Sequence, residues 1–216
     1  MRSLRVVLVF AALVVAATSS LAQGGGGGGG ARGGRGGGGG GGGQGGRGRG
    51  VRLMTLTSTG FKDGGEMPAK YSQNGAEMSP PLAWTGAPDS TKSFALIVHD
   101  LDAPVGNNGS DDTVQWMLWN IPPTVMSLAE HVPQGPQLPD GTRQIAVTGP
   151  YYRGPAAPAS GPPHHYVFEL FALDITLDVP AVGATPAATR SAVMAAMAGH
   201  VRGKANAVVL FRRPAP

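Results

Sequence analysis

The sequence predicts a mainly β domain with a single helix near its C-terminal end. Prolines and glycines recur every few residues between Gly60 and Pro163, which divides this part of the chain into short segments with irregular connections. The segments themselves are rich in β-branched and aromatic residues, which favour strands. One later stretch has helical spacing instead. Together these features favour a helix beside a mainly antiparallel sheet.

Five runs of branched and aromatic residues predict strands. In chain order they are Leu53 to Ser58, Phe94 to Asp100, Val114 to Ile121, His165 to Asp174 and Ala205 to Arg212. In the second run, positions 94, 96 and 98 share one face and positions 95 and 97 share the other. Both faces are apolar, so this strand is expected to be buried on both sides.

Two carboxylates and a proline end this buried strand, in the segment Asp100-Leu101-Asp102-Ala103-Pro104. A period of two places Asp100 and Asp102 on one face, so the two acidic groups are expected to converge at the edge of the core. Carboxylates in such a place need partners, because burying an unpaired charge is costly. The segment therefore looks like the wall of a ligand pocket.

The helix is predicted after Thr185, whose side chain can cap the first turn. Pro186 suits the first helical position, where no amide hydrogen is needed. An apolar face is expected before the end near Gly199 or just past it, formed by Val193, Met194, Met197 and Val201.

Three segments of different composition divide the chain. Residues 1–22 carry two arginines, an apolar run and small residues at Ser20-Leu21-Ala22, which predicts a cleaved export signal rather than a membrane-spanning helix. Residues 23–52 are almost pure glycine with scattered arginines, which predicts a flexible linker. Residues 53–216 are then one domain, exported to the periplasm or the cell exterior, with no transmembrane segment in the mature chain.

The excess of basic over acidic residues in the chain comes from its first 52 residues. Seven of the 17 lysines and arginines lie at or before Arg52, which leaves ten against all 13 acidic residues, a formal charge of −3 for the domain. We therefore expect no nucleic-acid partner for the domain. The four arginines between Gly24 and Gly50 lack interleaved aromatics, so they are a thin signal for RNA binding. There is no cysteine, so burial alone must hold the fold.

Several segments together resemble the phosphatidylethanolamine-binding protein family, in its bacterial branch described as Raf-kinase-inhibitor-like. The resemblance covers about Met54 to Arg213 and rests on five motifs in the family's order. They are Ser79-Pro80-Pro81-Leu82-Ala83-Trp84, Asp100-Leu101-Asp102-Ala103-Pro104, Trp116-Met117-Leu118-Trp119-Asn120-Ile121-Pro122, Gly161-Pro162-Pro163-His164-His165-Tyr166, and Gly199-His200-Val201 followed by Ala205 to Phe211.

This resemblance implies a large antiparallel sheet packed against a smaller one, and a small pocket for phosphate-like or acetate-like anions. By the same resemblance, the ligand-binding residues are Asp100, Asp102, Pro104, Gln115, Tyr152 and His164. Histidine and loop amides can donate to an anion, while the aspartates orient those donors. No catalytic residue and no cofactor is implied.

Three positions depart from the family's pattern. Gln115 stands where a second pocket histidine is usual, so this position can donate but never carries charge. Leu101 replaces a proline and releases a fixed backbone dihedral. His165 stands where arginine is usual, which predicts that binding depends on pH.

Other functions stay open on the sequence alone. Histidines 99, 164 and 165 with the two aspartates could form a metal site, although no metal is expected because no helical pair of histidines supports it. A weak hydrolase is a third hypothesis, but the Gly-x-Ser-x-Gly motif is missing and Ser79 precedes two prolines. We expect a non-enzymatic binding module for a small anion or phosphorylated head group. Inhibition of a partner kinase or protease, and a homodimer, remain alternatives.

Overall fold

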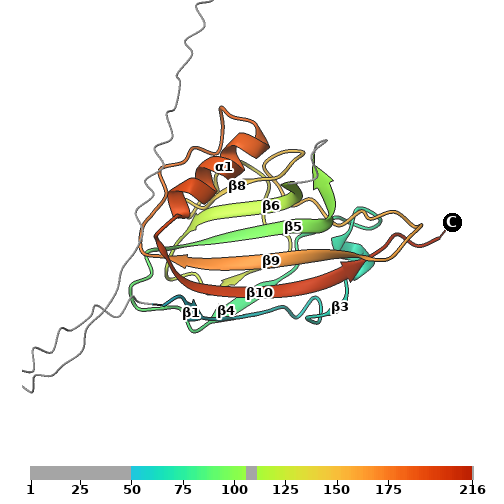
Figure 1. Ribbon diagram of the computed structural model, residues 1–216, viewed down its shortest axis with the longest axis horizontal. Coiled ribbons are helices and arrows are strands. Elements are labelled where there is room, and N and C mark those ends of the chain that lie inside the picture. The colour runs from blue at the N-terminus through green and yellow to red at the C-terminus, as the bar shows by residue number, and fades with distance from the viewer. Residues whose placement is uncertain (1–49, 106–110, 216) are drawn as a thin grey trace, which may run out of the picture. The chain divides into compact units, whose positions relative to one another are not determined.

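The computed structural model describes residues 50–105 and 111–215, which fold into two sheets and one α-helix (Figure 1). The predicted leader, and the predicted linker up to residue 49, lie outside this part of the chain. The strands are β1 (Arg52–Leu53), β2 (Thr55–Thr57), β3 (Gly65–Glu66), β4 (Leu82–Thr85), β5 (Ser93–Val105), β6 (Asp111–Ile121), β7 (Ser127–Leu128), β8 (Arg143–Ile145), β9 (His164–Leu173) and β10 (Val201–Phe211). The helices are η1 (Ala69–Tyr71), a short 3₁₀ turn, and α1 (Pro186–Met197).

The larger sheet has the strand order β1-β10-β9-β5-β6-β8, and β3 also pairs with β10. Its long central strands β10, β9, β5 and β6 run antiparallel to one another, as predicted. The sheet is nevertheless mixed, because β1 and β3 both pair with β10 in parallel. The smaller sheet has the order β2-β4-β7. The predicted fold class of two packed sheets and one helix is therefore confirmed.

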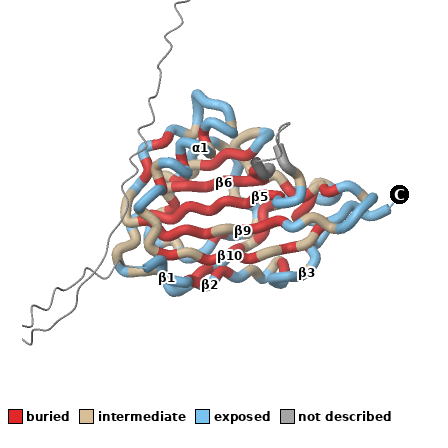
Figure 2. The backbone as a smooth tube through the Cα atoms, in the orientation of Figure 1, coloured by how far each residue is buried: buried red, intermediate tan, exposed pale blue. Residues whose placement is uncertain are grey.

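The central strand β5 is buried on both faces, as its composition predicts. Phe94, Leu96 and Val98 belong to a core cluster that includes residues of the smaller sheet, such as Leu56 and Trp84. Positions 95 and 97 belong to a second cluster that includes side chains of α1. Figure 2 shows the buried positions running along the central strands. The three tryptophans all lie in this core, as expected, with exposures of 2% or less.

The single helix α1 begins where the capping signal predicts. The hydroxyl of Thr185 accepts a hydrogen bond from the amide of Ala188 at 3.2 Å. Val193 and Met197 are buried against the sheet. The predicted apolar face is wrong in two members, since Met194 is 41% exposed and Val201 already belongs to β10. Adjacent helical residues are about 100° apart, so Met194 cannot share the face of Val193.

The first predicted strand, Leu53 to Ser58, is wrong as a single element. β1 pairs with β10 in the larger sheet and β2 pairs with β4 in the smaller one. Between them, the amide of Met54 donates to the carbonyl of Lys204 at 2.8 Å. The chain thus passes from one sheet to the other at Met54, whose side chain lies in the core between them.

Four strands of two to four residues were not predicted, namely β3, β4, β7 and β8. Strands this short carry too few side chains to show a period of two. Among the described residues, no helix is both long enough and apolar enough to cross a membrane.

Candidate functional site

The regular pairing of β5 with β6 is interrupted after Asp100, where the acidic segment begins. Asp100 pairs with Thr113 of β6, and the next pair along the register joins Pro104 to Asp112, so β5 has extra residues between them. Such bulges re-aim side chains and are common beside binding sites. The backbone of Pro104 continues β5, but its side chain lies outside what the structure describes. Its predicted contact with a ligand stays a prediction.

The carboxylate of Asp100 is buried and has two hydrogen-bond partners, the ring of His164 and the backbone amide of Asp102. Nδ1 of His164 lies 3.0 Å from Oδ2 and 3.2 Å from Oδ1, and the amide of Asp102 donates to Oδ1 at 3.0 Å. The hydroxyl of Tyr166, which accepts from the amide of Ala156 at 3.2 Å, interacts electrostatically with the same carboxylate. These donors compensate the cost of burying the charge.

His164 is thereby held with one ring nitrogen facing Asp100. Its side chain is 19% exposed, and its ring lies over that of Tyr166 with centroids 6.5 Å apart. A neutral imidazole that donates from Nδ1 can only accept at Nε2, whereas the imidazolium donates from both nitrogens. The imidazolium form, paired at Nδ1 with the Asp100 carboxylate, is therefore the form that can donate from Nε2 to an anion.

Asp102 has a different histidine partner from Asp100, which the sequence analysis did not foresee. Its Oδ2 accepts from the backbone amide of His165 at 2.5 Å and lies 2.9 Å from the Nδ1 of that residue. The hydrogen bond from the backbone amide of His165 lowers the pKa of the Asp102 carboxyl more than the contact with the imidazole ring does. Both side chains are about half exposed. The segment thus makes two Asp–His pairs, one buried and one at the surface.

Gln115 occupies a β-bulge in β6, opposite Val98 and His99 and one register pair before Asp100. Val98 pairs with Trp116 and His99 pairs with Val114, so Gln115 is the extra residue on its strand. Its backbone carbonyl accepts from the amide of Arg153 at 3.1 Å. The residue is 5% exposed, and within the described part of the chain its side-chain Oε1 has no hydrogen-bond partner.

Tyr152 is buried close to the bulge, but its hydroxyl already makes a hydrogen bond within the protein. It donates to the carbonyl of Tyr71 at 2.9 Å, and the ring meets Trp116 edge-on at 5.4 Å. Burial, followed by the charge of Glu77, raises the pKa of this phenol well above its usual value. Tyr152 therefore packs against the residue that follows Gln115. Its direct contact with a ligand stays a prediction.

Tyr166 is a site residue that the sequence reasoning missed. Its ring lies over that of His164, and burial, followed by the nearby Asp100 carboxylate, raises the pKa of its phenol. Its position two residues after His164 in a strand places both on one face. The period of two within the motif could therefore have identified it.

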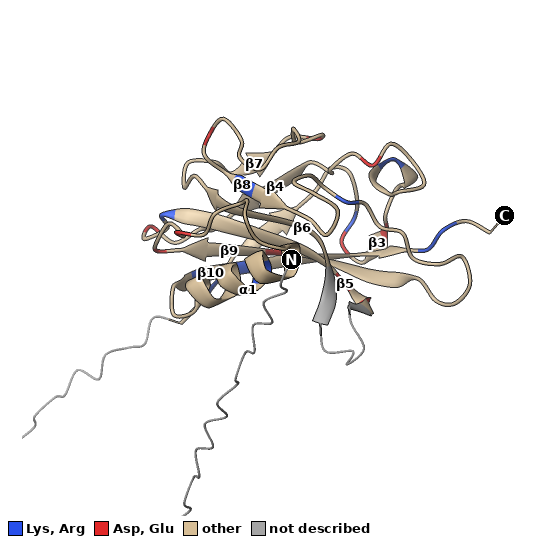
Figure 3. Cartoon of the chain, turned by 90° about the horizontal axis from the view of Figure 1, so that it is seen from above, with Lys and Arg blue, Asp and Glu red and all other residues tan. Residues whose placement is uncertain are grey.

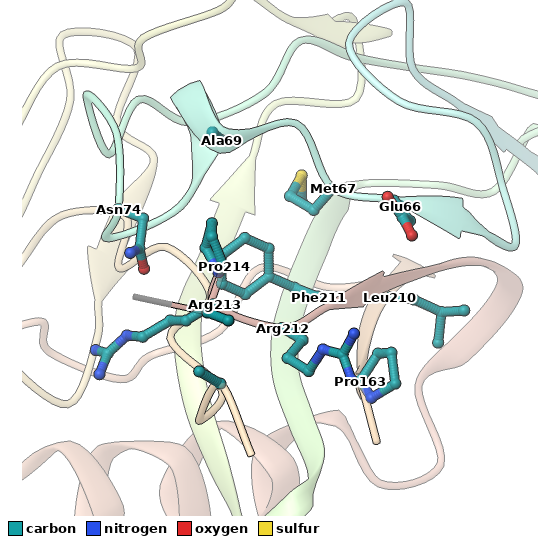
Figure 4. Close-up of a pocket in the computed structure, with 12 residues that line it drawn as sticks. Glu66, Met67, Ala69, Asn74, Pro163, Leu210, Phe211, Arg212, Arg213 and Pro214 are labelled. Atoms are coloured by element: carbon teal, nitrogen blue, oxygen red, sulfur yellow. The ribbon is translucent and has the colours of Figure 1, made fainter. Parts of the chain in front are cut away.

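A hollow of about 480 Å³ lies beside the segment that leads into His164 (Figure 4). Pro163, Phe211 and Met67 contribute apolar surface, and Arg212 and Arg213 contribute positive charge. Figure 3 shows this basic stretch just before the C-terminus. The residues that line the hollow do not include the buried Asp–His pair, so it is a neighbour of the predicted anion site and not the site itself.

The alternative of a metal site finds no support within the residues that the structure describes. There, no group of three histidine, cysteine or acidic side chains could hold a metal ion. His99 lies on the opposite face of β5 from Asp100, with its Nε2 3.3 Å from a carboxylate oxygen of Glu169.

The fold and this site together define a two-sheet β protein with a buried Asp–His pair at the mouth of its central strands. The family model for phosphatidylethanolamine-binding proteins matches residues 57–212, and the chain belongs to this family. It is 41% identical over 164 residues to a protein of Methanothermobacter thermautotrophicus named UPF0098, covering 74% of this chain and 99% of that one. A relative of the same name from Aquifex aeolicus is 33% identical over 167 residues, covering 76% of this chain and 91% of the relative.

Solved structures agree with this membership. A putative phosphatidylethanolamine-binding protein homologue from Chlamydia trachomatis is 31% identical with a TM-score of 0.62, over 76% of this chain and 99% of that one. YbcL of E. coli, described as a member of the mammalian family, is 26% identical with a TM-score of 0.63, over 74% and 98% of the two chains.

Proposed function

We propose that this protein is an exported, non-enzymatic binding protein that holds a small anion against His164. The observation that carries the proposal is the buried Asp100 carboxylate in contact with Nδ1 of His164. This contact orients the ring through Nδ1, so that Nε2 of the imidazolium form is the donor left for an anion.

The electrostatics of the site support an anionic ligand despite its two aspartates. Each aspartate has a histidine partner, since Nδ1 of His164 lies 3.0 Å from Asp100 and Nδ1 of His165 lies 2.9 Å from Asp102. The backbone amides of Asp102 and His165 donate to the same two carboxylates. An aspartate paired with an imidazolium has no net charge, so such a pair does not repel an anion as a bare carboxylate would.

Binding rather than hydrolysis is favoured by the state of the one candidate nucleophile. Ser79 is 2% exposed, and its hydroxyl accepts from the amide of Val132 at 2.8 Å. Hydroxyl nucleophiles need an adjacent general base, and the contacts described for this side chain include none. The serine holds a loop in place.

The family's name points to a phosphoethanolamine head group as the first ligand to test. Isothermal titration calorimetry of the full chain with phosphoethanolamine should show saturable binding that His164→Ala weakens at least tenfold. The matched control is His200→Ala, because Nδ1 of His200 also lies 2.9 Å from an aspartate, Asp174, but just beyond the opposite end of β9. Equal losses in the two variants, or no binding to the wild type, would refute the proposal.

A further inference from the structure

The side chain of Gln115 presents a buried acceptor for which the described residues supply no donor. The residue is 95% buried, and Oε1 finds no hydrogen-bond donor among the described residues. A buried polar atom without a partner is uncommon in folded proteins and calls for a physical explanation. A bound ligand that brings its own donor is such an explanation.

The position of Gln115 in a bulge strengthens this reading. Two residues of β6 face one of β5 at this point, between the pairs Val98–Trp116 and His99–Val114. A regular strand would keep positions 114 and 116 on one face, but here they belong to different core clusters. The bulge therefore breaks the alternation one register pair before Asp100, and the hydrogen bond from the amide of Arg153 to the Gln115 carbonyl holds it there.

We propose that Gln115 makes the site selective for anions that also donate a hydrogen bond, such as a singly protonated phosphate monoester. This inference rests on the proposed function and names the ligand class more closely. His164 supplies a donor to one ligand oxygen, while Oε1 of Gln115 accepts from a P–OH group on another. A phosphodiester of the same charge lacks that group and leaves Oε1 unsatisfied.

Two small probes of equal charge separate these ligands. At about pH 5, methyl phosphate is mostly a monoanion with one P–OH, because the second pKa of a phosphate monoester is about 6. Dimethyl phosphate is a monoanion without a donor. Protonation of the histidines affects both probes alike. The full-length protein should bind methyl phosphate about fivefold more tightly, the worth of one ordinary hydrogen bond.

The variant Gln115→Met keeps the size of the side chain and removes the acceptor. In this variant the ratio of the two affinities, for methyl phosphate and for dimethyl phosphate, should fall to about one. If both probes bind in a His164-dependent manner but their ratio is one in the wild type, or unchanged in the variant, the inference is overturned and the anion site stands. If neither probe binds, the proposed function fails and this inference fails with it.

A measurement without ligand tests the same claim independently. If Oε1 lacks a partner in the free protein, replacing it by an apolar group relieves a buried polar atom and raises the thermal midpoint by about 2–4 °C. A midpoint that stays the same or falls would show that the atom is already satisfied in the free protein, and would overturn the inference.

Discussion

Asp100 is the side chain on which the geometry of the site depends, because its buried carboxylate joins the ring of His164 to the backbone amide of Asp102. Asp100→Asn keeps the shape but replaces one acceptor oxygen with an amide that faces a donor. We expect a loss of about 1–3 kcal/mol in the free energy of unfolding, measured by urea titration. Asp102→Asn is the control, since its side chain is 41% exposed and should lose less than about 1 kcal/mol. Equal losses would contradict the account.

Glu169, on the outer face of the sheet, should control stability in acid. Contacts to His99 at 3.3 Å and Lys204 at 2.6 Å lower the pKa of its carboxyl to about 2 from an ordinary 4.5. A depressed pKa contributes stability that is present above about pH 4.5 and is lost as the pH falls toward 2. The contribution is at most about 3 kcal/mol.

Urea titrations of Glu169→Gln at pH 5 and near pH 2.5 test this expectation. Between pH 5 and pH 2.5, Glu169→Gln should lose less stability than the wild type. The loss in Lys204→Met should lie between those of the wild type and Glu169→Gln, because His99 remains. Identical pH dependence in wild type and Glu169→Gln would argue that the carboxyl is not stabilised in the folded state.

The sequence located some side chains of the site and misassigned others for physical reasons. Asp100 and His164 were identified by motif, and their contact follows from neighbouring strands. The separate pairing of Asp102 with His165 was not foreseen, because a bulge ends the period of two on which the prediction depended. The use of the Tyr152 hydroxyl by Tyr71 depends on a loop that no local pattern encodes.

The loop that carries Tyr152 is held close to the turn after η1 by a glycine. A Cβ on Gly154 would lie 2.6 Å from the carbonyl oxygen of Tyr71 and 2.8 Å from Cα of Ser72, both backbone atoms. Gly154→Ala should therefore push the loop outward and cost about 1–3 kcal/mol of stability, seen as a lower thermal midpoint. Gly50→Ala is the control, because nothing lies within 4 Å of its added Cβ. A midpoint unchanged in Gly154→Ala would show that the loop is free to shift.

Long strands were predicted well and short ones were not. β5, β6, β9 and β10 each have at least ten residues, enough to show branched and aromatic enrichment. The split of the first predicted strand at Met54 depends on two sheets competing for one segment, which is a tertiary effect. The burial of side chains in α1 also depends on tertiary packing, because Met194 is apolar and yet exposed.

The chain as a whole is proposed to be exported, and its leader gives a direct test. Mass spectrometry of the protein recovered from the exported fraction should find Gln23 as the first residue, because Ser20-Leu21-Ala22 fits a cleavage site. Ala22→Arg should block cleavage, since a large charged residue replaces the small one at the site. Recovery of the uncut chain in the cytoplasmic fraction alone would contradict export.

The central claim is that His164, held by Asp100, binds an anion, and its ring can be observed directly. A two-dimensional ¹H–¹⁵N spectrum of the histidine side chains, recorded during titration with phosphoethanolamine, separates His164 from His200 at the other end of the sheet. We predict a saturable shift of the Nε2 signal of His164 with little change at His200, and no such shift in Asp100→Asn. A ring signal of His164 that does not move at millimolar ligand, or that moves in parallel with His200, would contradict the claim.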